Sequence, residues 1–94
     1  MWVEDITDGS QVFRRAGNLS SGGIYLDQTI PIPVGVHVQL RFTLPGDDAA
    51  IIVTGEIVSI SATESLGMGV KFLGLAGAEQ QRIDAYLQRA ASPQ

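Results

Sequence analysis

The chain has 94 residues and a net charge of −4 at pH 7, and 45% of its residues are hydrophobic. This length and composition suit one folded domain with a modest core rather than a disordered tail. Only six residues are basic, which argues against binding along a nucleic-acid backbone. No apolar run reaches membrane-spanning length, and Cys is absent, so disulfides and thiolate metal sites are excluded. We therefore expect a cytoplasmic protein without membrane insertion.

The sequence predicts six β-strands separated by turns rich in Gly, Pro, Asp and Asn. The predicted strands span residues 2–7, 10–16, 24–29, 36–44, 50–61 and 66–72. The pattern is clearest over 36–44, where apolar residues at every second position predict a half-buried strand. Asp8-Gly9 predicts a two-residue hairpin turn, residues 62–65 predict another turn, and Gly55 is the expected site of a bend or bulge.

Residues 78–90 change to helical periodicity. Ile83, Tyr86, Leu87 and Ala90 share one face, and polar side chains that include Gln80 are expected to face water. The helix should pack on the sheet or over one mouth of a barrel.

The order of these elements predicts a mainly all-β single domain over residues 1–94. The β region covers about residues 2–74 and the C-terminal helix about 77–90. A closed barrel or a sandwich would both fit this order, and closure has the advantage that it hides the strand edges of a short chain.

Residues suited to catalysis are sparse. His37 is the only histidine, and it falls on the polar side of a predicted strand. Neither Cys nor a second His is available to form a nucleophile pair or a metal cluster. Asp47-Asp48 follows Pro45-Gly46, where Asp is an ordinary turn residue. We expect no catalytic residues, no metal site and no enzyme activity.

A glycine-rich corner over residues 17–23 contains the pattern [Asp/Asn]-x-Ser-x-x-Gly, filled by Asn18, Ser20 and Gly23. It is either a plain turn or a place where open backbone lets a ligand approach closely. Arg14-Arg15 just upstream is equally open to two interpretations. Solvated arginines are common at strand ends, but guanidinium groups also bind phosphate or a guanine edge in a bidentate way. Because neighbours on a strand point to opposite sides, only one of the two can point into a given site.

These segments together resemble the PilZ domain family, bacterial receptors and regulators linked to the second messenger cyclic di-GMP. The residues from Asn18 to Ile24 are similar to the family signature. The other similar segments are Pro31-x-x-Val34-Gly35-x-x-Val38-x-Leu40-x-Phe42, Gly55-x-Ile57-Val58 and Gly67-Met68-Gly69-Val70-x-Phe72. The resemblance covers about residues 12–87.

The resemblance implies a six-stranded antiparallel β-barrel with one C-terminal α-helix, no cofactor, and cyclic di-GMP as the ligand. The candidate ligand-binding residues lie in or just before the glycine-rich corner. They are Arg14, Arg15, Asn18, Ser20, Gly22 and Gly23. A second family element, an Arg-x-x-x-Arg motif before the first strand, occurs nowhere in this chain. Charge-assisted hydrogen bonds contribute about 1.5–3 kcal/mol each, so the loss of two predicts binding weaker by about a hundredfold or more.

Two functions remain in competition. The first is a signalling module that binds cyclic di-GMP weakly or incompletely, with Arg14, Arg15 or an upstream segment completing the site. The alternative is a degenerate PilZ domain that binds no nucleotide and acts as a protein-interaction or dimerisation module. Either would work with a protein partner or a neighbouring domain, and either is compatible with a homo-oligomer. A barrel that binds nucleic acid or oligosaccharide is disfavoured by the acidic charge and the few aromatic residues.

Overall fold

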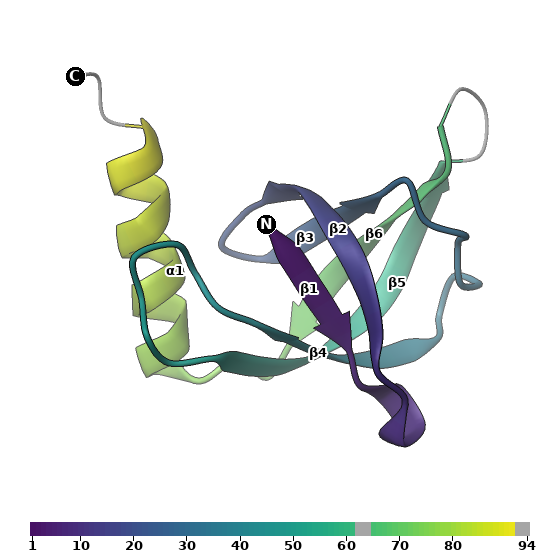
Figure 1. Ribbon diagram of the computed structural model, residues 1–94, viewed down its shortest axis with the longest axis horizontal. Helices are drawn as coiled ribbons and strands as arrows, with labels where there is room; N and C mark the ends of the chain where they lie inside the picture. The colour runs from purple at the N-terminus through teal and green to yellow at the C-terminus, as the bar shows by residue number, and fades with distance from the viewer. Residues whose placement is uncertain (62–64, 92–94) are drawn as a thin grey trace.

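Six strands and a C-terminal helix make up the computed structural model, which describes residues 1–61 and 65–91. The strands are β1 (Trp2–Asp5), β2 (Val12–Leu19), β3 (Gly23–Asp27), β4 (His37–Phe42), β5 (Ile51–Ser61) and β6 (Gly67–Leu73). A short 3₁₀ helix, η1 (Thr7–Gly9), joins β1 to β2, and α1 (Gly77–Ala91) follows β6 (Figure 1).

The strands close into an antiparallel barrel in the order β1-β2-β3-β6-β5-β4. Pairing of β1 with β4, through Glu4 with Arg41 and Asp5 with Leu40, completes the ring. Closure leaves no strand at an open edge. The predicted six-stranded antiparallel barrel with one C-terminal helix is therefore confirmed, and the arrangement is a barrel rather than a sandwich.

Alternation along the strands places their apolar residues inside the barrel. β4 alternates perfectly between exposed and buried residues over its whole length. The buried hydrophobic residues from the strands are Val3, Ile24, Leu26, Val38, Leu40, Phe42, Ile51, Val53, Ile57, Met68, Val70 and Phe72. The rings of Phe42 and Phe72 stack inside with centroids 6.1 Å apart. Burying one large apolar side chain contributes about 1.5–3 kcal/mol, so this interior is the main source of stability.

Helix α1 packs against the barrel beside the β2–β3 turn and the loop between β4 and β5 (Figure 1). Ile83 is fully buried in the core, and Tyr86 and Leu87 pack on its edge. Arg82 Nε donates to Asp47 Oδ2 at 2.8 Å and so ties the helix to the loop. Ala90, expected on the apolar face, is exposed instead, so the packed face of the helix ends before it.

The connection from β1 to β2 is longer than the predicted two-residue hairpin. Its 3₁₀ turn has Asp8 at φ 55° and Gly9 at φ 77°. Two hydrogen bonds of Thr7 hold the start of this connection: its N–H donates to Asp5 Oδ1 at 3.1 Å, and its Oγ accepts from Gln39 N at 3.0 Å.

Two further local expectations were wrong. Strand β2 continues to Leu19, so Asn18 lies in a strand rather than in the corner. The pairing of β2 with β3 shifts register between Ala16 and Asn18, which leaves Gly17 without a register partner on β3. The irregularity of β5 falls between Ile57 and Ser59 rather than at Gly55. At Gly55 a Cβ would meet the Val70 side chain, so the glycine serves close packing there. The turn predicted over 62–65 lies mostly outside the described residues.

Candidate ligand-binding groove

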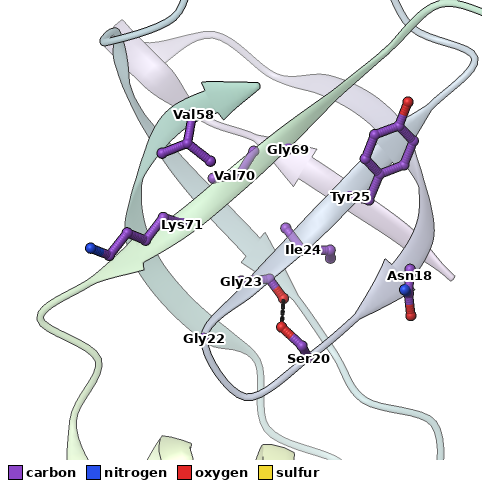
Figure 2. A pocket seen from close by; sticks show the side chains of 10 residues that line it. All are labelled: Asn18, Ser20, Gly22, Gly23, Ile24, Tyr25, Val58, Gly69, Val70 and Lys71. Carbon is purple, nitrogen blue, oxygen red and sulfur yellow. Dashed lines mark hydrogen bonds between the residues drawn. The ribbon is translucent and has the colours of Figure 1, made fainter. Parts of the chain in front are cut away.

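The turn between β2 and β3 is held by backbone hydrogen bonds. Ser20 N donates to the Gly23 carbonyl oxygen at 2.9 Å, and Ser20 Oγ donates to the same oxygen at 3.2 Å (Figure 2). Phe72 N on β6 donates to the Gly22 carbonyl oxygen at 2.9 Å. The turn is therefore fixed to the neighbouring strand rather than free in solvent.

Gly23 is required by the close approach of β3 to β6. A Cβ at this position would lie closer than 3.0 Å to the Val70 carbonyl oxygen, a separation that real Cβ atoms essentially never show. Gly22, one residue earlier, has open space where its Cβ would be. The two glycines of the signature thus differ: Gly23 allows the strands to meet, and Gly22 leaves backbone open to solvent.

An open groove of about 390 Å³ runs across the outer surface of β3 and β6, beside this turn. Its lining residues are Asn18, Ser20, Gly22, Gly23, Ile24, Tyr25, Val58, Gly69, Val70 and Lys71. Figure 2 shows Tyr25 and Asn18 on one side, Val58 and Lys71 on the other, and the glycine backbone of both strands between them. The floor is therefore mostly backbone, which a flat ligand could approach closely.

Four of the predicted ligand-binding residues come together in this groove: Asn18, Ser20, Gly22 and Gly23. Asn18 is the register partner of Tyr25, and both belong to the same rim. Asn18 is exposed, so its amide is free to offer donors and an acceptor to a ligand. Asn18 lies in β2 rather than in the turn, and this position places it beside the groove. The register shift after Ala16 determines which residue of β3 it faces.

The two predicted arginines do not line the groove. Arg14 has a side chain only 14% exposed, with Nε 3.2 Å from Asp5 Oδ2, and it also donates to Thr29 Oγ. Arg15 lies on the other side of the strand, half exposed, with Nε 3.6 Å from Asp27 Oδ1. The two side chains point to opposite sides, as expected for strand neighbours. Arg14 is held in the protein, whereas the longer contact of Arg15 leaves it freer to move.

Sequence reasoning missed six of the residues that line the groove: Ile24, Tyr25, Val58, Gly69, Val70 and Lys71. Tyr25 directly follows the signature, and its position alone could have suggested it. Lys71 and Val58 come from β6 and β5, and only the strand order of the barrel brings them to the turn. Within residues 1–61 and 65–91, no cluster of three or more His, Asp or Glu side chains is arranged to hold a metal.

The sequence model of the PilZ domain matches residues 2–89, nearly the whole chain. The chain belongs to the PilZ domain family. PilZ domains are binding and regulatory modules, not enzymes, in agreement with the sparse catalytic residues. The family membership confirms the resemblance identified from the motifs.

A solved structure with a similar fold is that of the Bacillus subtilis inhibitor of motility, MotI/DgrA. The two superpose with a TM-score of 0.79 at 18% sequence identity, over 95% of this chain and 46% of that protein. The PilZ chain described here thus corresponds to less than half of the inhibitor's length, and at this identity the likeness concerns the fold. No curated protein matches the sequence significantly. In the described part of the chain, no helix combines the length and hydrophobicity needed to cross a bilayer.

Proposed function

We propose that this PilZ domain is a signalling module that binds cyclic di-GMP in the groove beside the β2–β3 turn. Its affinity should be lower than that of a PilZ domain with an Arg-x-x-x-Arg motif. The observation that carries the proposal is the convergence of Asn18, Ser20, Gly22 and Gly23 on one groove.

The groove suits one end of the dinucleotide. Its volume of about 390 Å³ lies in the lower part of the range of small-molecule sites, about 300–1,000 Å³. The Asn18 amide can bond the edge of a guanine, and the Tyr25 ring stands beside it at the rim. The open backbone at Gly22 allows the base or the sugar to approach without meeting a side chain.

The start of the chain lies close to this site. The Met1 carbonyl oxygen accepts a hydrogen bond from Ala16 N at 2.9 Å, two residues before Asn18. In a longer protein, any segment preceding Met1 would therefore leave the barrel beside the turn. A basic segment there would supply positive charge that Arg14 and Arg15 do not bring to the groove, because both are engaged in ion pairs.

A second candidate function is protein interaction without nucleotide. Trp2 on β1 and Phe13 on β2 are 65% and 62% exposed, which is unusual for large aromatic side chains. Their register partners place them on the same outer surface of the barrel as diagonal neighbours. This surface does not include the groove, so both functions could coexist in one domain.

Calorimetric titration with cyclic di-GMP tests the proposal. The wild-type chain and an Asn18→Ala/Ser20→Ala variant are compared, both checked for folding by circular dichroism. We expect micromolar or weaker binding by the wild type and a loss of about tenfold or more in the variant. No heat at high micromolar ligand would reject nucleotide binding by this chain, and equal binding by the variant would reject the groove as the site.

A further inference from the structure

Lys71 on β6 lies directly across from the signature turn. Its register partner on β3 is Gly23, and its side chain is exposed at the rim of the groove (Figure 2). The hydrogen bond from Phe72 N to the Gly22 carbonyl oxygen fixes β6 against the turn immediately after Lys71. The base of this side chain therefore has a fixed position relative to the turn, while its four-carbon stem is free to swing.

The other basic residues are either engaged in ion pairs or do not line the groove. Arg14, Arg15, Arg41 and Arg82 form ion pairs with Asp5, Asp27, Glu4 and Asp47 respectively. Arg89 lies near the end of α1 and does not line the groove. Lys71 does line it, and it forms no ion pair within residues 1–61 and 65–91.

We propose that Lys71 binds a phosphate group of the cyclic dinucleotide and supplies part of the positive charge that the absent arginine motif would otherwise provide. This inference rests on the proposed function, because it assigns a contact within the same groove. A phosphodiester entering an acidic domain needs a cation, and a lysine ammonium offers three donors on a flexible stem. The glycine floor between Lys71 and the turn leaves a path for a phosphate to lie against the backbone.

Glu56 on β5 faces Lys71 across the strand pair and tunes this site. The two residues are register partners, and no ion pair joins them. Directly opposed side chains on one face of a sheet have Cβ atoms about 4.5–5.5 Å apart, so the carboxylate opposes the approach of an anion to Lys71. Removal of this negative charge should strengthen binding of the dinucleotide.

The test compares dissociation constants for cyclic di-GMP between the wild type and Lys71→Gln, Lys71→Arg, Glu56→Gln and Arg89→Gln. Lys71→Gln should weaken binding about tenfold to a hundredfold, and Lys71→Arg should retain most of the affinity. Arg89→Gln makes the same change in net charge at a residue that does not line the groove, and it should change affinity by less than about twofold. Glu56→Gln should bind more tightly than the wild type.

The outcomes separate the two proposals. Binding by the wild type with an equal affinity for Lys71→Gln would overturn the role of Lys71 and leave the groove as the site. An Arg89→Gln variant weakened as much as Lys71→Gln would show a general charge effect and would also overturn the specific contact. No binding by the folded wild type would reject the proposed function and this inference with it.

Discussion

Gln80 of α1 donates a hydrogen bond from Nε2 to the carbonyl oxygen of Ser21 at 3.0 Å. This bond joins the C-terminal helix to the middle of the signature turn. The same amide donates to Asp84 Oδ1 at 3.3 Å, which orients it. Gln80 had been expected to face water, and its actual position makes α1 a direct neighbour of the candidate binding site.

Substitution of Gln80 should therefore affect the turn and its ligand. Gln80→Ala removes the exposed hydrogen bond to Ser21 and the one to Asp84 on the same helix, so the free energy of unfolding should fall by about 0.5–1.5 kcal/mol. Cyclic di-GMP should shift the backbone NMR signals of α1 in the wild type and shift them less in Gln80→Ala. Gln81→Ala, one residue along on the exposed side of the helix, is the control. Identical shifts in all three proteins would show that the bond does not connect the helix to the site.

The two signature glycines should differ in their tolerance of alanine. Gly23→Ala forces a Cβ against the Val70 carbonyl oxygen, so β3 and β6 must separate. The expected cost is about 1–3 kcal/mol, seen as a lower midpoint in thermal unfolding. Gly22→Ala meets open space and should change stability by less than about 0.5 kcal/mol. Equal midpoints for the two variants would contradict the packing described for Gly23.

Substitution of Arg14 should lower the free energy of unfolding more than substitution of Arg15, because only Arg14 is held in the protein interior. Arg14→Gln leaves the carboxylate of Asp5, which is 5% exposed, without its ion pair. Loss of one partner of a buried pair costs about 3–5 kcal/mol. Arg15→Gln breaks a longer, partly exposed contact and should cost about 1 kcal/mol or less. Chemical denaturation measures the free energy of unfolding of both variants. A smaller decrease for Arg14→Gln than for Arg15→Gln would refute the buried ion pair assigned to Arg14.

Stability should decrease in acid through Glu4 and Asp47. The hydrogen bond from Gln11, supported by Arg41, lowers the pKa of Glu4, and the hydrogen bond from Arg82 lowers the pKa of Asp47. With folded-state pKa values below those of the unfolded chain, the unfolded state binds more protons in acid. The stabilisation is therefore present above the ordinary carboxylate range and is lost as the pH falls through the folded-state values.

Denaturant unfolding between pH 7 and pH 2 checks this direction. The free energy of unfolding should fall as the pH drops below about 4, and Glu4→Gln should make the fall shallower. Gln81→Ala changes an exposed residue of α1 and serves as the control. A wild-type stability that rises in acid would contradict the ion pairs assigned to these carboxylates.

Side-chain alternation made most of the barrel predictable from the sequence. The period of two in residues such as Val38, Leu40 and Phe42 identifies both the strand and its inner face. The position of Asn18 was not predictable, because Gly17 interrupts the alternation and only the observed pairing shows that β2 resumes after it. A turn rich in small polar residues looks the same in sequence whether it starts at residue 17 or at residue 20.

The parts of the site that depend on strand pairing could not be read from the sequence. Arg14 meets Asp5 because β1 and β2 are paired, and Arg15 meets Asp27 because β2 and β3 are paired. Lys71 reaches the turn only because β6 lies next to β3 in the closed barrel. The motif therefore identified one side of the groove, and the barrel topology supplied the other.

The proposed binding of cyclic di-GMP places the ligand in the groove between the signature turn and β6. Its most direct test is a titration of the ¹⁵N-labelled chain with the dinucleotide, followed by backbone NMR. The largest shifts should fall on Asn18, Gly22, Gly23 and Lys71, with little change at Trp2 and Phe13 on the outer surface of β1 and β2. A spectrum that stays unchanged at millimolar ligand, or shifts centred on Trp2 and Phe13, would contradict it.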